Sequence, residues 1–282
     1  MVIKTLYSQL KARFAQAGLE TPELDARLLL EAALNMTQED ILRQSNESVD
    51  NATQEKLEEM AQRRLAHEPV SRILGTRHFW KGQFLISKDT LDPRADSETL
   101  VEAVLKHANA SKPLRILDIG TGTGCLLLSL LQDLPLATGI GIDISADAIK
   151  TATANAQELG LSKSAAFITT HWNDYHPDIP FDAVISNPPY IPDGDIANLP
   201  PEVRLYDPAQ ALAGGVDGLT CYREIISLLP RFLAKNGFVF LEIGHDQAKS
   251  VPLLLSELGF LILQAVPDLS GHTRCLVAHP GN

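Results

Sequence analysis

The chain has few cysteines, and it has fewer basic than acidic residues. Both features exclude certain classes of protein and of binding site. Cys125, Cys221 and Cys275 lie far apart and include no Cys-x-x-Cys pair. We therefore expect buried thiols in a reducing compartment, and neither a disulfide framework nor a metal site. The 24 lysines and arginines are outnumbered by 35 aspartates and glutamates, which gives a net charge of −11. Because nucleic-acid affinity rests on basic side chains, this balance argues against a broad phosphate-binding face, although it leaves room for a local basic strip.

Long apolar runs are also missing. No run approaches the roughly 20 residues of a membrane span, and residues 1–9 lack a continuous apolar core of signal-peptide length. We therefore expect a cytoplasmic protein that does not bind a membrane. At 282 residues, 45% of them hydrophobic, the chain can form one large domain or two smaller ones. Its oligomeric state cannot be read from the sequence.

Residues 1 to about 75 carry the signals of helices. Leu6, Leu10 and Phe14 recur at helical spacing, and Thr21-Pro22-Glu23 supplies a cap, an N-terminal proline and an acid for the first turn of the next helix. Further helices are expected to begin after Thr37 and near Asp50. The region holds nine basic and twelve acidic residues. It is either a structural cap or a docking surface for a macromolecular partner.

Strands and helices alternate from residue 114 onward. Strands are expected at 115–118, 139–143, 165–169, 181–186, 238–243, 260–265 and 274–278, with helices at 125–134, 146–159, 221–233 and 247–258. This alternation predicts an α/β fold with a mainly parallel sheet and helices on both faces. Residues 78–86 are expected to form a hairpin around Lys81-Gly82. We therefore divide the chain into a helical domain (1–75), a hairpin linker (76–92) and an α/β domain (93–282).

A glycine-rich loop joins the first of these strands to its helix. It carries Gly120-Thr121-Gly122-Thr123-Gly124, where glycines let the backbone approach a ligand and the helix start offers free N–H groups. The Gly-x-Gly-x-x-Gly pattern of diphosphate binders would need a third glycine at position 125 if it began at Gly120, or at position 127 if it began at Gly122. Neither position is glycine, and a Gly-Lys-Ser/Thr loop is absent as well. The loop indicates a nucleoside ligand without phosphates.

Two side chains that follow the next two strands fit such a ligand. Asp143 lies 23 residues after Gly120, about the spacing at which an acid binds ribose hydroxyls in nucleotide-binding sheets. Its other interpretation is a helix cap. Trp172 follows the third strand, and its indole can stack on an adenine or serve for packing alone.

The segment Ser186-Asn187-Pro188-Pro189-Tyr190-Ile191 follows the buried strand 181–186. Two prolines in a row hold the chain extended and donate no hydrogen bond. We expect a stiff hook at the carboxyl end of the strand, where open α/β sheets bind ligands. The side-chain oxygen of Asn187 and the backbone oxygen of Pro188 can each accept one hydrogen of a planar NH2 group. Tyr190 or Pro189 would pack on its plane. The alternative is an ordinary turn in which the Asn187 side chain is satisfied.

Two further stretches leave more than one role open. Residues 192–218 are too long and too polar for a plain connection, so a lid or binding loop is expected. Pro93-Arg94-Ala95-Asp96-Ser97-Glu98 precedes a helix of about residues 97–108. Asp96 is expected to cap that helix. For Arg94 and Glu98 we expect surface ion pairs and leave a functional role open.

Together these segments resemble the class I methyltransferases that use S-adenosylmethionine. Within that class they are most similar to the protein-(glutamine-N5) methyltransferases of peptide chain release factors, the PrmC/HemK family. The resemblance covers nearly the whole chain. It is carried by Pro93-Arg94-x-Asp96-Ser97-Glu98, Asp118-x-Gly120-Thr121-Gly122-Thr123-Gly124, Asn187-Pro188-Pro189-Tyr190-Ile191, Arg204-x-Tyr206-Asp207-Pro208, Leu241-Glu242-Ile243-Gly244 and Asp268-Leu269-Ser270-Gly271. One departure is Ala95, where the family often has proline, and it removes no polar group.

The resemblance implies a Rossmann-like, mainly parallel seven-stranded sheet and S-adenosyl-L-methionine as cofactor, with S-adenosyl-L-homocysteine as product and no metal. It implies that Gly120, Thr121, Gly122, Thr123 and Gly124 line the methionine and ribose portion, that Asp143 holds the ribose hydroxyls, and that Trp172 flanks the adenine. Asn187 would lie where cofactor and substrate meet, with Pro188 and Tyr190 as further catalytic residues and Pro189 as a substrate contact.

The implied reaction is methyl transfer to the side-chain amide nitrogen (N5) of the glutamine in the Gly-Gly-Gln motif of class 1 release factors, a modification in translation termination. Two alternatives remain at this point. Adenine-N6 methyltransferases acting on DNA or RNA share the Asn-Pro-Pro-Tyr motif, although the acidic charge balance argues against them. A non-catalytic partner-binding protein could also retain a cofactor fold.

Overall fold

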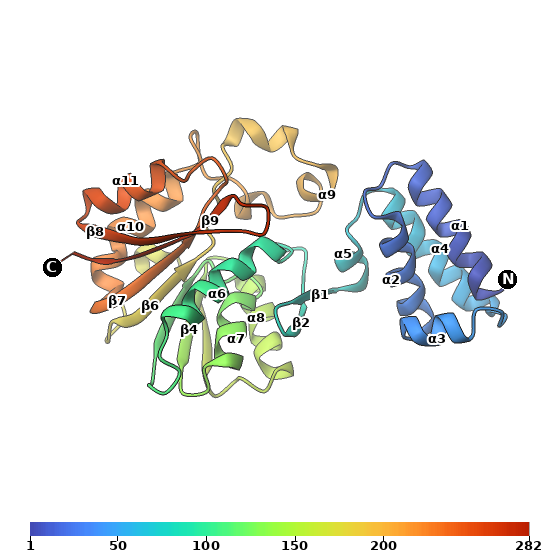
Figure 1. Cartoon of the computed structure of the whole chain (residues 1–282), viewed down its shortest axis with the longest axis horizontal. Coiled ribbons are helices and arrows are strands. Elements are labelled where there is room, and N and C mark those ends of the chain that lie inside the picture. The colour runs from blue at the N-terminus through green and yellow to red at the C-terminus, as the bar shows by residue number, and fades with distance from the viewer. Residues whose placement is uncertain (282) are drawn as a thin grey trace. The chain divides into compact units, whose positions relative to one another are not determined.

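The computed structural model describes residues 1–281, which divide into two compact units (Figure 1). The helical unit holds Met1–Gly75 together with Pro200–Tyr206, and the sheet unit holds Thr76–Leu199 and the described residues from Asp207 on. The sequence placed residues 76–92 in a linker and residues 200–206 in the α/β domain. In the structure, Phe79 and Phe84 of the hairpin are buried in the core of the sheet unit, so the hairpin is part of that unit.

The helical unit consists of α1 (Ile3–Gln16), α2 (Pro22–Leu34), α3 (Gln38–Arg43), α4 (Asn51–Leu65) and α5 (Val70–Leu74). Their apolar faces share one core. Two of the expected caps are confirmed: the Thr37 side chain accepts from the Asp40 N–H, and the Asp50 side chain accepts from the Thr53 N–H. The cap expected at Thr21 is wrong, because its side chain accepts from no N–H of α2 and its hydroxyl donates to Asp25 Oδ1 instead. Helix α5 was not foreseen, because its five residues are too few to show an apolar period.

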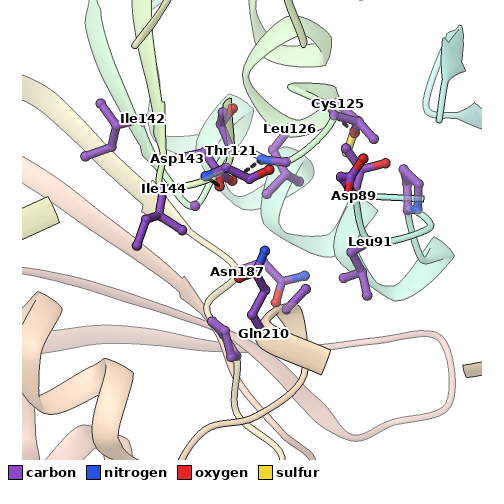
Figure 2. A pocket seen from close by; sticks show the side chains of 18 of the residues that line it. Asp89, Leu91, Thr121, Cys125, Leu126, Ile142, Asp143, Ile144, Asn187 and Gln210 are labelled. Carbon is purple, nitrogen blue, oxygen red and sulfur yellow. Dashed lines mark hydrogen bonds between the residues drawn. The ribbon is translucent and has the colours of Figure 1, made fainter. Parts of the chain in front are cut away.

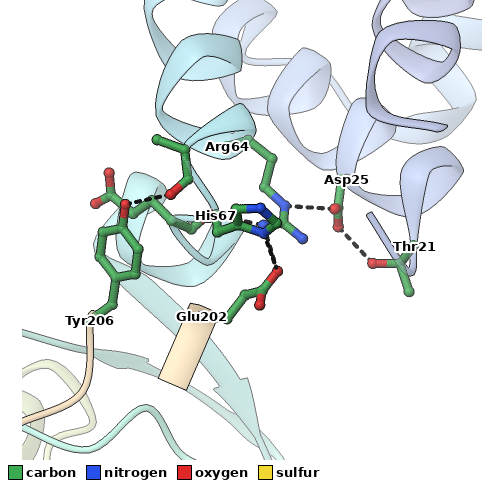
Figure 3. A network of polar contacts seen from close by, with 8 residues as sticks. Thr21, Asp25, Arg64, His67, Glu202 and Tyr206 are labelled. Carbon is green, nitrogen blue, oxygen red and sulfur yellow. Dashed lines mark hydrogen bonds and ion pairs between the residues drawn. The ribbon is translucent and has the colours of Figure 1, made fainter. Parts of the chain in front are cut away.

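The segment 200–206 belongs to the helical unit through specific contacts (Figure 3). It contains the short helix α9 (Pro201–Arg204). The Glu202 carboxylate lies 3.2 Å from Nδ1 of His67 and 3.4 Å from Nη1 of Arg64. The Tyr206 hydroxyl donates to the Ala66 carbonyl at 2.8 Å. A segment remote in the sequence thus completes the helical unit.

The sheet unit contains the hairpin β1 (Thr76–Phe79) and β2 (Gly82–Leu85) and a seven-stranded sheet in the order β5-β4-β3-β6-β7-β9-β8. Its strands are β3 (Arg115–Ile119), β4 (Thr138–Asp143), β5 (Ala165–Thr169), β6 (Phe181–Ser186), β7 (Leu233–Glu242), β8 (Phe260–Pro267) and β9 (Thr273–Pro280). Strands β5, β4, β3, β6 and β7 run parallel, and β9 pairs antiparallel with both β7 and β8. The predicted seven strands and their mainly parallel arrangement are confirmed.

Helices cover both faces of the sheet (Figure 1). On one face, α6 (Glu98–His107), α7 (Cys125–Asp133) and α8 (Ala146–Glu158) pack with the hairpin. On the other face lie α10 (Thr220–Phe232) and α11 (Ser250–Glu257). Short 3-10 turns complete the unit: η1 (Ala95–Ser97), η2 (Trp172–Asp174), η3 (Asp193–Asn198) and η4 (Ala209–Ala211). None of the helices within residues 1–281 has both the length and the apolar character that crossing a membrane requires.

The strand order fixes where a ligand can bind. After β3 the chain continues to β4 and β5 on one side and then returns to β6 on the other side of β3. Such a switch point leaves a crevice at the carboxyl ends of the two central strands. Ile119 at the end of β3 pairs with Ser186 at the end of β6. The glycine loop and the proline hook therefore leave the sheet side by side.

Candidate active site

A pocket lies at this carboxyl edge of the sheet (Figure 2). Its walls come from the glycine loop after β3, the ends of β4 and β5, the hook after β6, and two further segments, 89–94 and 210–211. The second of these lies in the long loop that was expected to be a lid or binding loop. The lining residues are Asp89, Thr90, Leu91, Pro93, Arg94, Ser97, Gly120, Thr121, Gly122, Thr123, Cys125, Leu126, Ile142, Asp143, Ile144, Ser145, Thr170, Trp172, Asn187, Pro189, Gln210 and Ala211. The structure thus brings Asn187, Asp143, Trp172 and most of the glycine loop to one cavity.

All three loop glycines have a positive φ, and Gly124 is also tightly packed. Gly120 and Gly122 have φ angles of +72° and +55°, and no atom lies within 4 Å of where a Cβ would stand. Glycine is required at these two positions for its backbone conformation, because other residues rarely adopt a positive φ. At Gly124 a Cβ would lie 3.0 Å from the Phe167 ring, and Gly124 is outside the pocket lining. Gly124 also has a positive φ, +76°, so it combines this backbone conformation with close packing. Its expected cofactor contact stays a prediction.

Asp143 is held against the loop by backbone groups. Its Oδ2 accepts from the Gly122 N–H and its Oδ1 from the Ser145 N–H, both at 2.9 Å. A carboxylate has about four lone-pair directions, so two remain for other donors. An acid fixed this way on a pocket wall suits a pair of vicinal hydroxyls, such as those of a ribose.

Asp118 lies beneath the same loop and is fully buried. Its Oδ2 accepts from the Thr121 hydroxyl at 2.6 Å, while its Oδ1 has no hydrogen-bond partner within residues 1–281. Burial raises the pKa of Asp118 to about 7, the Thr121 hydrogen bond opposes this rise, and the charge of Asp143 adds to it. The loop thus rests on a carboxyl group that titrates near neutrality.

Trp172 stands on the pocket wall with its ring orientation fixed. The indole N–H donates to the Glu224 carboxylate at 2.8 Å, and the His171 ring lies beside it with centroids 4.6 Å apart. Ile144, 61% exposed, lines the same cavity. A flat aromatic face and an apolar side chain can bind a purine ring, which fits a nucleoside whose sugar reaches Asp143.

At the start of the hook, a side-chain hydrogen bond joins the two central strands β6 and β3. The Ser186 hydroxyl donates to the Ile119 carbonyl at 2.7 Å. The next side chain, Asn187, is half-buried on the pocket wall, and its Nδ2 donates to Ser97 Oγ at 3.2 Å. Among residues 1–281, no group donates to Asn187 Oδ1 or to the Pro188 carbonyl oxygen. Two acceptors are therefore free at the hook.

The remaining hook residues differ in position. Pro189 lines the pocket, whereas Pro188 and Tyr190 are not part of the lining. The Tyr190 ring packs against the core under α10, and burial raises the pKa of its hydroxyl to about 12. Its backbone carbonyl accepts from Gln247 Nε2 at 3.1 Å. A direct part for the Tyr190 ring, or for the Pro188 carbonyl, in substrate contact stays a prediction.

The segment before α6 departs from expectation at Asp96. The residue lies inside the turn η1, α6 begins only at Glu98, and no side chain caps the helix. Asp96 instead pairs with Arg274 on β9 at 3.2 Å. Its expected capping role is wrong, because a residue within the turn cannot reach the first free N–H groups of the helix.

The two charged residues of the same segment also find partners. Arg94 forms an ion pair with the buried carboxylate of Asp207, so the predicted ion pair exists, and Arg94 lines the pocket as well. Glu98 accepts from the Trp80 N–H at 2.8 Å and so ties α6 to the hairpin, where a surface ion pair was expected.

Comparison with known proteins bears on what this pocket serves. A family model described as PrmC N-terminal domain matches residues 5–75, and one described as Methyltransferase domain matches residues 110–242. The chain is 46% identical over 266 residues to the release factor glutamine methyltransferase of Rhodospirillum rubrum, with 94% of this chain and 81% of the relative covered. The chain belongs to the release factor glutamine methyltransferase family. This membership confirms the resemblance that the sequence motifs indicated.

Further members of the family align over most of their length. The release factor glutamine methyltransferase of Bradyrhizobium diazoefficiens is 42% identical over 281 residues, with 98% of this chain and 94% of the relative covered. A solved structure of a release-factor-specific protein-(glutamine-N5) methyltransferase from Alicyclobacillus acidocaldarius is 30% identical, covers 67% of this chain and 94% of its own, and superimposes with a TM-score of 0.42.

Several pocket residues escaped the sequence analysis. Ser97, Ile144, Thr170 and Gln210 line the cavity, yet each is a common residue outside the glycine loop and the hook. For Ser97 the Pro93–Glu98 motif was a signal, although it did not say which side chain reaches the pocket. Gln210 comes from the long loop expected to be a lid or binding loop, and that expectation was the available signal.

Proposed function

We propose that this chain transfers a methyl group from S-adenosyl-L-methionine to the N5 amide nitrogen of the glutamine in the Gly-Gly-Gln motif of class 1 peptide chain release factors. The products are the methylated release factor and S-adenosyl-L-homocysteine, and no metal takes part. The observation that carries the proposal is the free side-chain oxygen of Asn187, which shares one pocket with the glycine loop and Asp143. An acceptor for an amide N–H thus lies in the same pocket as the residues proposed to bind the nucleoside.

The pocket residues divide into those that bind the cofactor and those that orient the substrate. Gly120 to Thr123 present backbone along one wall, Asp143 supplies lone pairs for ribose hydroxyls, and Trp172 with Ile144 provides apolar faces for adenine. When bound, S-adenosylmethionine supplies an electrophilic methyl carbon on a positively charged sulfur. Family membership supports this cofactor.

The hook holds and polarises the substrate amide. An amide nitrogen is a weak nucleophile because its lone pair is delocalised into the carbonyl group. Asn187 Oδ1 and the Pro188 carbonyl oxygen each accept one of its two N–H groups, which fixes the plane of the amide and aims the nitrogen. Orientation of this kind contributes up to about 7–11 kcal/mol to lowering a barrier.

The same two acceptor oxygens also stabilise the charge that develops on the substrate nitrogen. As the nitrogen attacks the methyl carbon, positive charge develops on its N–H groups, and two oxygens already in place stabilise that charge without reorganising. The methylated nitrogen then loses its extra proton readily, so a strong base at the hook is unnecessary. The hook, residues 186–191, contains no histidine or lysine.

The test is a transfer assay with the full chain and S-adenosylmethionine labelled in its methyl group. Separate reactions contain a class 1 release factor, the same factor with the glutamine of its Gly-Gly-Gln motif changed to alanine, DNA, or RNA. We expect label in the unmodified factor alone. Label recovered at adenine N6 of DNA or RNA would instead support an adenine methyltransferase, and an unlabelled release factor would refute the proposal.

A further inference from the structure

Asn187 and Glu242 leave the sheet as neighbours. In the pairing of β6 with β7, Ser186 lies opposite Leu241, so the next residues of the two parallel strands are Asn187 and Glu242. Asn187 faces the pocket, whereas Glu242 is 2% exposed and lies outside the pocket lining. The carboxylate is therefore placed behind the amide that the proposed reaction uses.

Glu242 is poorly satisfied for a buried carboxylate. Its Oε2 has no hydrogen-bond partner within residues 1–281. Burial raises its pKa to about 7, although the nearby polar side chains of Ser97 and Asn187 and the charge of Arg274 each oppose that rise. A buried acid without a full set of partners costs stability. Such a residue often has a functional reason for its place.

The titratable groups that act on Glu242 come from every element around it. They are Arg274 and Cys275 on β9, Asp96 in η1, Tyr190 after β6, Tyr222 on α10 and Cys125 on α7. The ordinary pKa values of tyrosine and cysteine already lie above neutrality, and burial raises those of these four residues further. Near pH 7, Glu242 is thus the group in this cluster that changes charge.

The oxygen and the NH2 group of the Asn187 amide are similar in shape. The neighbouring side chains must therefore determine which of the two faces the substrate. Ser97 is 3% exposed and shares a hydrogen bond with Asn187. A serine hydroxyl both donates and accepts, so it satisfies either end of the amide. An ionised carboxylate only accepts. Glu242 therefore discriminates where Ser97 cannot, because it attracts the NH2 end and repels the oxygen.

We propose that Glu242, together with Ser97, is a positioning residue that keeps the Asn187 nitrogen turned toward the two of them and leaves its oxygen free for the substrate amide. This inference rests on the proposed function for its catalytic meaning and on the geometry for the orientation itself. Rotating the Asn187 amide by half a turn would present NH2 to the NH2 of the substrate, and the two groups could not form the aiming hydrogen bond.

The kinetic test compares Glu242→Gln, Ser97→Ala and the control Ser129→Ala in the full chain, with a class 1 release factor as substrate. Ser129 is also a buried serine, but it lies on α7 and outside the pocket lining. We expect Glu242→Gln to lower kcat about tenfold to a hundredfold at pH 8, with KM and the Kd of S-adenosylmethionine near the parent values. The hydrogen bond from the substrate amide to Asn187 Oδ1 strengthens in the transition state, so weakening it should lower kcat more than it changes KM.

The pH profile adds a signature that a purely structural residue would lack. The kcat of the parent should rise as Glu242 loses its proton around pH 7, because the neutral acid can donate to the Asn187 oxygen and permits the wrong orientation. Glu242→Gln should lose this rise. Ser97→Ala should keep the rise of kcat around pH 7 but reach a lower maximal kcat. Ser129→Ala should have the same pH profile as the parent.

A spectroscopic test reports the orientation without turnover. The side-chain NH2 resonances of Asn187 are assigned by their loss in Asn187→Ala. They should shift as the pH passes about 7 in the parent, and this shift should disappear in Glu242→Gln.

If the resonances follow Glu242 while the parent labels no release factor, the proposed function fails and the positioning role stands. If Glu242→Gln keeps parental kcat, or loses kcat while the Asn187 resonances titrate as in the parent, the positioning role is overturned. Ser97→Ala serves as the second variant should Glu242→Gln fold poorly.

Discussion

At the scale of single residues, the proposed function gives Asn187 to the substrate and Asp143 to the cofactor. Both line the pocket, but Asn187 keeps a free oxygen, whereas both oxygens of Asp143 already accept backbone N–H groups and have lone pairs left over. Asn187 suits a transient contact to a reacting amide. Asp143 suits a lasting contact to a ligand that stays through the reaction.

Substituting these two residues should therefore affect different constants. We expect Asn187→Ala to lower kcat by about 100- to 1,000-fold, the loss typical when a group that stabilises developing charge is removed. The Kd of S-adenosylmethionine should change little. Asp143→Ala should raise that Kd before anything else. Calorimetric titration with the cofactor and initial-rate kinetics separate the two, and an Asn187→Ala variant that turns over near the parental rate would remove this residue from the mechanism.

Asp118 supplies a second prediction at this scale, because it is fully buried and has a pKa raised from 3.8 to about 7. A raised pKa in the folded state gives stability at low pH that is lost as the pH rises from the unfolded value through the folded one. Between pH 5 and pH 8 the folded parent should lose about 2–3 kcal/mol through this group. Asp118→Asn should not lose it, so the variant gains on the parent as the pH rises.

Urea unfolding at the two pH values measures this difference. Both tryptophans, Trp80 and Trp172, lie in the sheet unit, so their fluorescence follows the unit that contains Asp118. A constant difference between parent and variant across pH 5 to 8 would mean that Asp118 titrates outside this window.

At the scale of elements, the hook is held in place by one side chain of another loop. Gln247 is 5% exposed. Its Nε2 donates to the Tyr190 carbonyl at 3.1 Å and to the Gly218 carbonyl at 3.0 Å, and its Oε1 accepts from the Gly244 N–H at 2.9 Å. One amide thus joins the hook, the end of the long loop and the turn after β7.

Gln247→Ala should consequently weaken both stability and catalysis. Each backbone group left buried without a partner costs about 1–3 kcal/mol, so the melting temperature of the sheet unit should fall. The kcat should fall as well, because the carbonyl that anchors the end of the hook loses its restraint, while cofactor affinity should remain. Gln62→Ala, on the exposed side of α4, is the matched control. Parental kcat in a destabilised Gln247→Ala would show that the hook needs no such anchor.

The elements and part of the site follow from the sequence because both depend on local signals. Asn187, Asp143, Trp172 and the glycine loop could be assigned to one pocket, since each follows a strand and the carboxyl ends of parallel strands converge. Other contacts depend on which distant elements pack together. Leu241-Glu242-Ile243-Gly244 was one of the family motifs, but nothing local placed Glu242 next to Asn187 or Arg274 next to Asp96, so the structure was needed to find these neighbours.

At the scale of the whole molecule, the helical unit is completed by a segment from elsewhere in the chain. The long loop after β6 is closed at its base, where Ile191 N–H donates to Leu212 O at 3.0 Å and Gly214 N–H donates to Ile191 O at 2.8 Å. Residues 200–206 from within this loop belong to the helical unit. A fragment of residues 1–75 alone would therefore lack the carboxylate of Glu202 that faces Arg64 and His67.

The centre of this arrangement is Arg64, whose side chain is 6% exposed. Its Nε donates to Asp25 Oδ2 at 2.7 Å, the Thr21 hydroxyl donates to the other oxygen of Asp25 at 2.9 Å, and its Nη1 lies 3.4 Å from Glu202 (Figure 3). Removing one partner of a buried ion pair leaves the other charge buried and uncompensated. The usual cost is about 3–5 kcal/mol.

We therefore expect Arg64→Ala to destabilise the helical unit by about that amount, whereas the double variant Asp25→Leu/Arg64→Met should recover most of the loss, since apolar residues of similar volume remove both charges together. Hydrogen exchange of the full chain measures this unit by unit: amides of α2 and α4 should exchange faster in Arg64→Ala, with those of β3 and β6 unchanged. Equal acceleration in both sets would mean that the two units unfold as one. If instead the double variant exchanges as fast as Arg64→Ala, the loss came from packing, and the ion pair is not what secures the helical unit.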